Sequence, residues 1–543
     1  MAMTTTGTVN EMIMSSVFTL TTPLSRRFGP RLGQLLSKRS GTPDQVIETP
    51  SFVTSTSRGV VPHLSRDHHR ATKAIRWANV PFETFLEHNP PVPTLLTGAN
   101  PMHNFLGFVP GQHLLSLCIR DPADGREMPP NGNKHTSAYC LRGVRKVSPE
   151  NWRTYVEACQ PDMVVAMYDQ PFTDPPYSQK RLTKSIERTS AWLADLLLSL
   201  QSSQSSRHRP LVLVQMAGGT NIAARKAFST NLTDILYGKE ADAIAPLTCL
   251  DEGVFGYTFD LVPLRQSLDP TTPDSPTPTA DPTLPDPVPS DVSTQSCVQT
   301  TQLIPFIQAS LSSLPTTKIR VTHTARSPHE ILRLIQDVGI DIFDAHWAQK
   351  AADVGVALDF QFPVPKHGAT TRRNGKRDLG HNLYHSQYTH DLCWMASSFS
   401  KERPCTCLAC SPFSPATRIE HSIVDHDSQD PIASNTQKPS FSRAYIHHLL
   451  HTHEMSAHSL LTMHNLTILD EFFSGIRSVL STAEGKSFFV EVDRFVDEYD
   501  ETLEVFDEAR LLWREVDLAR GKGRLAREKS KQTQSTLGTA IQG

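Results

Sequence analysis

Long hydrophobic runs and an excess of charge of one sign are both absent from this sequence of 543 residues. No apolar run approaches the ~20 residues that a membrane-spanning helix needs, so we expect no transmembrane segment. Lysines and arginines number 53 against 56 aspartates and glutamates, which gives a net charge of −3. This balance provides no global basic field, and any contact with nucleic acid must therefore be local.

Cysteine is scarce, and most of it follows no disulfide framework. Six of the nine cysteines are scattered singly: Cys118, Cys140, Cys159, Cys249, Cys297 and Cys393. An odd count without regular spacing indicates reduced thiols in a reducing compartment. Arg26, Arg27 and Arg31, with Glu11 as the only early acid, give the N-terminus a faint transit-peptide character. We expect a cytoplasmic protein, and peripheral association with the mitochondrial outer membrane is the alternative.

The glycine fingerprint of phosphate-binding loops is also missing, since Gly218-Gly219 follows an apolar run without the rest of that motif. Short apolar runs instead alternate with segments of helical periodicity. The expected strands are Met163–Tyr168, Leu211–Gln215, Lys318–Thr322 and Ile340–Phe343, and the expected helices are Gln179–Leu200, Asn221–Leu236 and Pro328–Val338. This alternation predicts a parallel α/β sheet. We expect a closed (β/α)8 barrel of the TIM type rather than an open Rossmann sheet.

Three cysteines do cluster, because Cys405, Cys407 and Cys410 follow the spacing C-x-C-x2-C. Thiolates so close repel one another unless a cation holds them, and a soft divalent ion is the natural occupant. The pattern predicts a zinc site whose fourth ligand lies downstream. Six histidines compete for that place: His447, His448, His451, His453, His458 and His464.

Composition divides the chain into parts. They are a disordered polar tail (1–15), the barrel (16–400), a zinc-binding region with C-terminal helices (401–510) and a charged tail (511–543). Eight prolines from Pro270 to Pro289 prevent residues 266–296 from burying enough apolar surface to offset their ordering entropy, so we expect a disordered insertion there. Residues 411–440 are similarly loop-like. A loop of that length between metal ligands adds only a logarithmic closure cost.

The segment from Phe441 to Leu449 and the pair His464-Asn465 make the chain resemble the tRNA-guanine transglycosylase family. That family has a C-x-C-x2-C cluster, then a Ser/Thr-Arg-Ala-Tyr-Ile-His-His-Leu segment, then a His-Asn that closes a zinc site. The resemblance implies one structural Zn²⁺ held by Cys405, Cys407, Cys410 and His464. It extends upstream through Thr49-Pro50, Val61–Leu64, Ser148–Glu150 and Gly339–Asp344.

The resemblance also implies a chemistry, the exchange of guanine for queuine at the wobble position of tRNAs with GUN anticodons. In this exchange a carboxylate attacks the ribose C1′, much as in retaining glycosidases. Asp344 occupies the nucleophile's place, and Asp169 and Gln215 match positions that recognise the base. The family's Gly-Gly appears as Gly256-Tyr257, where Tyr257 would crowd the base.

The sequence departs from the catalytic members at two further motifs. No Asp-Ser-Gly-Gly occurs around Leu114–Asp121, and no Pro-Thr-Arg follows Asp344. Eukaryotic enzymes of this family pair a catalytic subunit with a paralogue that keeps the fold and the zinc but loses the active site, and this chain is similar to that paralogue. We therefore expect a non-catalytic subunit with an inactive Asp344. The alternatives are an active, diverged transglycosylase and a zinc-bearing tRNA-binding scaffold.

The implied partners are tRNA and the catalytic queuine tRNA-ribosyltransferase subunit, with a homodimer in that subunit's absence. A basic run could contact tRNA phosphates, or could be a solvated loop: Arg372, Arg373, Lys376 and Arg377. The C-terminal helical layer is expected to form much of the interface with the catalytic subunit. It carries an apolar stripe at helical spacing: Leu466, Leu469, Phe473 and Ile476. The alternative is that this stripe packs on its own barrel.

Overall fold

The computed structural model describes residues 17–21, 26–126, 128–170, 176–202, 208–269, 298–365, 372–373, 375–396, 405–411, 440–482 and 486–521. The expected tail at 1–15, most of the insertions at 266–296 and 411–440, and the last part of the charged tail lie outside these residues. The chain divides into two compact units. One comprises residues 1–50, 76–322 and 337–342, and the other residues 51–75, 323–336 and 343–543.

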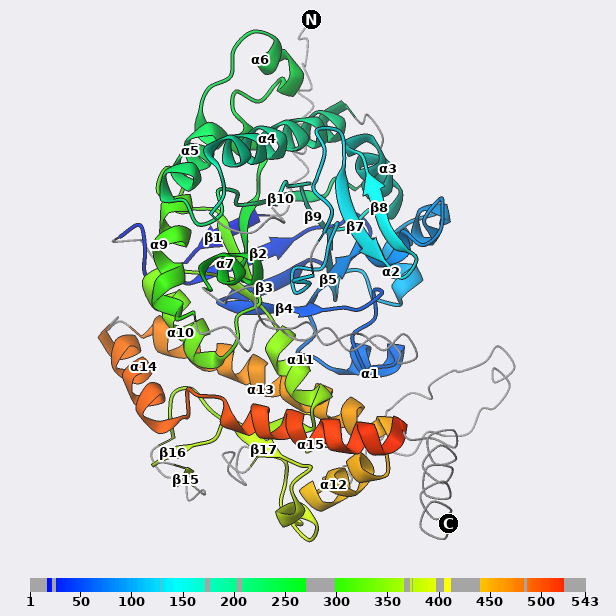
Figure 1. Cartoon of the computed structure of the whole chain (residues 1–543), viewed down its shortest axis with the longest axis vertical. Coiled ribbons are helices and arrows are strands. Elements are labelled where there is room, and N and C mark those ends of the chain that lie inside the picture. The colour runs from blue at the N-terminus through cyan, green and yellow to red at the C-terminus, as the bar shows by residue number, and fades with distance from the viewer. Residues whose placement is uncertain are drawn as a thin grey trace, which may run out of the picture. The chain divides into compact units, whose positions relative to one another are not determined.

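Eight strands form a closed barrel in the order β10-β11-β12-β13-β4-β5-β6-β9 (Figure 1). Their bounds are β4 Ser51–Ser55, β5 Trp77–Pro81, β6 Leu114–Cys118, β9 Met163–Val165, β10 Leu211–Gln215, β11 Gly256–Asp260, β12 Ile319–His323 and β13 Ile342–Asp344. Each strand pairs with its predecessor and successor along the chain, as in a (β/α)8 barrel. Nearly every strand residue is buried, as expected when helices cover a parallel sheet. The predicted fold class is therefore confirmed.

The first unit adds two antiparallel sheets to its barrel strands. One is formed by β1 (Val17–Leu20), β2 (Gly33–Ser37) and β3 (Gln45–Thr49), and the other is a hairpin of β7 (Thr136–Cys140) and β8 (Gly143–Val147). Its helices are α2 Pro101–Leu106, α3 Pro149–Cys159, α4 Gln179–Ser202, α5 Ile222–Thr233, α6 Lys239–Ile244, α7 Leu261–Leu268 and α9 Thr300–Leu311, with short 3-10 turns η1 Phe82–Phe85, η2 Val92–Leu95 and η3 Leu250–Gly253.

Two helices of this unit show how local sequence sets their limits. The apolar side chains of α4 at Leu182, Trp192 and Leu196 are buried, and this one-sided burial explains the predicted helix. Helix α5 begins after Asn221, whose side chain accepts a hydrogen bond from the N–H of Ala224. It ends at Thr233, three residues earlier than the predicted Leu236.

The second unit contains β4, most of α10 and the C-terminal helices. Its other elements are α1 Arg66–Ala71, α10 Pro328–Asp337, α11 His346–Asp353, β14 Val356–Leu358, β15 Arg372–Arg373, β16 Lys376–Arg377, β17 Gly380–Asn382, η4 Ser386–Tyr388, α12 Arg443–His451, α13 Met455–Ser481, α14 Lys486–Glu498 and α15 Glu504–Gly521. Helix α13 is its centre and packs against α11, α12, α14, β4 and β14 (Figure 1). Across the part of the chain that is described, no helix is both long enough and apolar enough to cross a membrane.

The apolar stripe of α13 faces the interior of its own chain. Leu466, Leu469, Phe473 and Ile476 are all 0% exposed. The ring of Phe473 stacks on Phe52 of β4 and on Phe343 of β13, with centroids 5.9 and 5.8 Å apart. The stripe therefore packs within its own chain, which was the alternative, and burying it there removes it from water. A partner interface on the C-terminal helical layer stays a prediction.

Candidate metal site and barrel pocket

Cys405, Cys407 and Cys410 meet His464 of α13 in the second unit. Their Sγ atoms lie 3.7, 3.4 and 3.6 Å from His464 Nδ1, and the four ligand atoms lie within 4.8 Å of one another. All four residues are buried. Tetrahedral coordination with metal–sulfur bonds of ~2.3 Å and a metal–nitrogen bond of ~2.0–2.1 Å needs sulfur–nitrogen separations of about 3.6 Å. The cluster therefore fits a closed, four-ligand metal site.

The residues around His464 fix its ring for this role. His464 Nε2 lies 2.9 Å from the carbonyl oxygen of Leu358, and donation to that oxygen leaves Nδ1 unprotonated for a metal. The neighbouring Asn465 accepts a hydrogen bond from Leu358 N–H at 2.9 Å and donates to the carbonyls of Ala348 and Val356. The His-Asn pair of the resemblance thus joins the metal ligand to β14.

Three of the five competing histidines contact backbone carbonyls instead. His447 Nδ1 lies 2.8 Å from the carbonyl of Leu383, and His451 Nε2 lies 3.1 Å from that of Tyr384. His458 Nδ1 contacts the carbonyl of Ala352 at 3.0 Å. Within the described residues, the Cys405–His464 cluster is the one group of histidine, cysteine and acidic side chains with metal-holding spacing. The four residues implied by the resemblance are therefore the four that the fold brings together.

Asp344 ends β13, and its carboxylate is turned into the protein. Oδ2 accepts a hydrogen bond from Thr324 N–H at 2.7 Å and lies 3.7 Å from His323 Nδ1. Oδ1 is buried and has no hydrogen-bond partner among the described residues. The N-cap of the following helix α11 is Ala345. Asp344 is thus a covered strand-end acid and not a helix cap.

A cavity of about 50 Å³ lies in the first unit, where β9, β10 and β11 end. Asp169 and Gln215 both line it, together with Gly218 and Gly219 of the loop before α5. Gln215 Oε1 accepts a hydrogen bond from Thr258 Oγ1 at 2.5 Å. The two residues that the resemblance assigns to base recognition thus share one pocket. Ligand pockets of parallel barrels lie at this carboxyl end of the strands.

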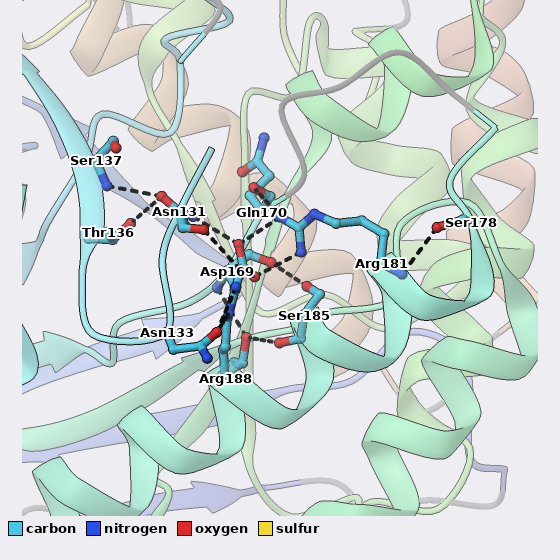
Figure 2. Close-up of polar contacts among 11 residues, drawn as sticks. Asn131, Asn133, Thr136, Ser137, Asp169, Gln170, Ser178, Arg181, Ser185 and Arg188 are labelled. Carbon is cyan, nitrogen blue, oxygen red and sulfur yellow. Dashed lines mark hydrogen bonds and ion pairs between the residues drawn. The ribbon is translucent and has the colours of Figure 1, made fainter. Parts of the chain in front are cut away.

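The Asp169 carboxylate is saturated by neighbouring side chains (Figure 2). Oδ1 accepts from Asn131 Nδ2 at 2.9 Å and from Arg181 Nη2 at 2.8 Å, and Oδ2 accepts from Arg181 Nη1 and Arg188 Nη1, both at 2.8 Å. The side chain is 0% exposed. Ser185 and Thr189 bond the backbone of Asp169 from the same helix, α4. These partners of Asp169 were not predicted from the sequence. The signal that could have indicated them is the spacing of the polar residues at 181, 185, 188 and 189, which places them on one face of the helix.

The expectation that Tyr257 crowds the base position is wrong. Tyr257 lies at the start of β11, is 0% exposed and donates its hydroxyl to Asp251 Oδ1 at 2.7 Å. The pocket is lined instead by Phe259 and Asp260. Tyr257 therefore does not crowd the base position. Tyr168 donates to Asp260 Oδ2 at 3.0 Å across the pocket, and burial raises the pKa of this tyrosine.

The basic run forms the hairpin β15–β16. Lys376 Nζ donates to the carbonyl of Val496 at 2.7 Å. Arg377 is 3% exposed, lies 3.7 Å from a carboxylate oxygen of Glu498 and covers the ring of Tyr499. These two side chains hold the hairpin to the end of α14, so the buried charge of Arg377 is not open to a phosphate. An RNA contact by the remaining run stays a prediction.

Comparison with known proteins matches the chain to the family described as queuine tRNA-ribosyltransferase, over residues 28–246 and 292–500. It is 24% identical over 461 residues to queuine tRNA-ribosyltransferase accessory subunit 2 of Aedes aegypti, covering 83% of this chain and 86% of that protein. It is 26% identical over 476 residues to the protein of that name from Schizosaccharomyces pombe, covering 88% and 83%. The protein of that name from Ixodes scapularis is 24% identical over 454 residues, covering 83% and 94%.

Proposed function

Because the chain belongs to the queuine tRNA-ribosyltransferase family, we propose that it is the non-catalytic subunit of a heterodimeric tRNA-guanine transglycosylase. Its partner is the catalytic queuine tRNA-ribosyltransferase subunit. The pair exchanges guanine for queuine at the wobble position of tRNAs with GUN anticodons. The name shared by the relatives, accessory subunit 2, supports this division of roles.

The burial of the Asp344 carboxylate is the observation that best supports a non-catalytic role. A carboxylate that attacks the ribose C1′ must present an oxygen to the sugar. One oxygen of Asp344 accepts the N–H of Thr324, and the other is buried. Asp344 is 3% exposed, so neither oxygen of the residue in the nucleophile's place is presented at the surface.

The second carboxylate that base exchange requires has no equivalent on β6. That strand consists of Leu114, Leu115, Ser116, Leu117 and Cys118. The nearest following acid, Asp121, accepts the N–H of Ala123 at 2.9 Å and so takes part in its own turn. Loss of one acid–base group typically lowers a rate ~10²–10⁴-fold. A chain that lacks the second carboxylate and buries the first is suited to support and not to chemistry.

We propose zinc as the metal of the Cys405–His464 site. Three thiolates and one imidazole select zinc over magnesium, calcium or manganese, which prefer oxygen ligands. With four protein ligands and no open position, the ion is structural. It ties the segment at 405–411 to α13, two segments far apart in the sequence.

The subunit's proposed contribution is assembly and tRNA binding in the cytoplasm. None of the eight cysteines that the structure describes is in a disulfide, which supports a reducing compartment. On this proposal the heterodimer has a single active site, which lies in the catalytic subunit. Phosphate contacts from this chain can therefore add to tRNA affinity without taking part in the reaction.

The test is to purify both subunits, mix them at micromolar concentrations and follow size exclusion. Labelled guanine or queuine exchange into tRNA is then measured for each chain alone and for the pair. We expect coelution, no exchange by this chain alone, and more exchange by the pair than by the catalytic chain alone. Separate elution contradicts the proposal. Exchange by this chain alone indicates the diverged enzyme, and tRNA binding without partner binding indicates the scaffold.

A further inference from the structure

The hairpin of β7 and β8 in the first unit carries a concentration of positive charge (Figure 1). From Asn131 to Val147 the sequence contains no aspartate or glutamate. The same stretch contains four lysines and arginines, all of them exposed: Lys134, Arg142, Arg145 and Lys146. Because the whole chain has a net charge of −3, this is a local excess and not a general property of the surface.

These charges are not used inside the chain. Across the described residues, the side chains of Lys134, Arg142 and Lys146 have no hydrogen bond and no ion pair. Arg145 donates from Nε to the carbonyl oxygen of Leu86 at 3.3 Å and has no carboxylate partner there. The hairpin β15–β16 differs, because two of its cationic side chains are held by α14. The β7–β8 hairpin therefore presents its charge to the outside.

The positive charges also act on a neighbouring side chain. Burial lowers the pKa of His135, and the charges of Lys146 and Arg188 lower it further. A second cation is therefore disfavoured at the start of β7, as expected where positive potential is concentrated. An anion placed there would be attracted by the same potential.

The hairpin is fixed to the barrel before any ligand arrives. Asn131 Oδ1 accepts the N–H of Ser137 at 2.9 Å, and Asn131 Nδ2 donates to Asp169 at 2.9 Å (Figure 2). Glu83 Oε2 accepts the N–H of Tyr139 at 3.1 Å. Both strand β7 and the loop before it are thus tied to residues at the ends of barrel strands. A surface held in place in this way loses little conformational entropy on binding.

The composition of the hairpin favours a nucleic acid over a protein partner. Protein interfaces are enriched in aromatic residues and depleted in lysine, whereas phosphates are contacted chiefly by arginine and lysine. Leu141 is the one large apolar side chain that the hairpin exposes. We propose, resting on the proposed function above, that the β7–β8 hairpin is a docking surface for the phosphate backbone of tRNA. Its contacts hold the RNA and do not read its bases.

The test is filter binding of a tRNA transcript with a GUN anticodon, to the full chain alone and to the heterodimer, between about 50 and about 200 mM salt. Arg142→Glu with Lys146→Glu should weaken binding at least tenfold at the lowest salt concentration. Two lost phosphate contacts should also reduce the slope of log affinity against log salt by ~1.4–1.8. Arg142→Gln with Lys146→Gln should reduce the slope similarly without introducing acids.

Lys226→Glu with Lys239→Glu is the matched control, because both lysines are exposed, on α5 and α6 of the same unit, and the change in net charge is identical. This pair of changes should leave the slope as in the wild type. Circular dichroism and a metal content of one ion per chain establish that each variant is folded.

An unchanged slope in the folded Arg142 and Lys146 variants overturns the inference, as does an equal loss in the control, which would assign the effect to net charge. Loss of coelution with the catalytic subunit in the absence of RNA overturns it too, because the hairpin would then be a protein interface. Failure of the proposed function is read separately, from coelution and exchange by the wild-type pair.

Discussion

The ring of Phe473 on α13 lies stacked on the ring of Phe343 on β13, with an interplanar angle of 28°. Phe343 directly precedes Asp344, so helix α13 supports the strand that carries the residue in the nucleophile's place. The same helix carries His464. One helix therefore connects the metal site with the end of β13 inside the second unit.

Phe473→Ala should lower the free energy of unfolding by ~3–5 kcal/mol, because it leaves a cavity between two aromatic rings. Phe489→Ala on α14 is the control, since Phe489 is 43% exposed and should cost far less. Denaturant unfolding followed by circular dichroism measures both. Equal, small effects would mean that α13 is not packed as described. Neither variant should weaken partner binding once its folded fraction is taken into account.

Cys407→Ser should lower metal content and stability together. Apparent binding energies of ~10–16 kcal/mol for structural zinc make the ion part of the fold. Cys393→Ser is matched, because Cys393 is an exposed thiol outside the cluster. Elemental analysis of protein purified without chelators should give about one zinc per chain for the wild type and the control. A wild type with well under one zinc contradicts the site.

His329 should make stability depend on pH. Burial lowers its pKa from 6.5 to about 4, while Nε2 lies 3.2 Å from the carbonyl of Tyr499. Since the folded pKa lies below the unfolded one, this contribution is complete above pH 6.5 and is lost as the pH falls toward 4. His329→Gln keeps a donor for that carbonyl and should reduce the loss between about pH 7.5 and pH 5 by on the order of 2 kcal/mol.

Thermal unfolding at the two pH values, compared between His329→Gln and the wild type, measures this difference. The exposed His448 on α12 provides the control His448→Gln, which should follow the wild type. If His329→Gln follows it too, the histidine already titrates normally in the folded chain.

Arg372→Glu with Arg373→Glu should weaken tRNA binding by the heterodimer and flatten its salt dependence. Each lost phosphate contact should reduce the slope of log affinity against log salt by ~0.7–0.9. Lys226→Glu with Lys239→Glu, at exposed positions of α5 and α6 in the first unit, controls for the change in net charge. Filter binding of tRNA across a series of salt concentrations measures both the affinity and this slope. An unchanged slope in the double variant assigns the hairpin a structural role alone.

Local pattern determined much of the fold. Leu211–Gln215 was predicted to the residue, because the apolar run there follows Pro210 and ends at the polar Gln215. The predicted strand Met163–Tyr168 ends earlier, at Val165, although Ala166 and Met167 remain buried. A run of apolar residues indicates which residues are buried, but it does not show at which residue the hydrogen bonding between strands ends. Strands β3 (Gln45–Thr49) and β4 (Ser51–Ser55) illustrate the same limit, since these adjacent runs join different sheets.

Part of the candidate site could likewise be predicted from the sequence, and part could not. The cysteine spacing is local and readable, but selecting His464 from six histidines needs either the family resemblance or the fold. The link between Asp169 and Arg181 was not predictable, because helical periodicity does not say which strand a polar face of α4 meets. The inward direction of Phe473 was equally ambiguous, since an apolar stripe suits an internal core and a partner surface alike.

The most direct measurement of the central claim is exchange of labelled guanine by the heterodimer carrying Asp344→Ala in this chain. The variant pair must coelute and hold one zinc per chain for the measurement to count. As a control, the nucleophilic aspartate of the catalytic subunit is replaced by alanine, which should abolish exchange. The account predicts that the Asp344→Ala pair retains activity close to wild type. Loss of exchange in this intact pair would show that Asp344 is catalytic and would contradict the accessory role.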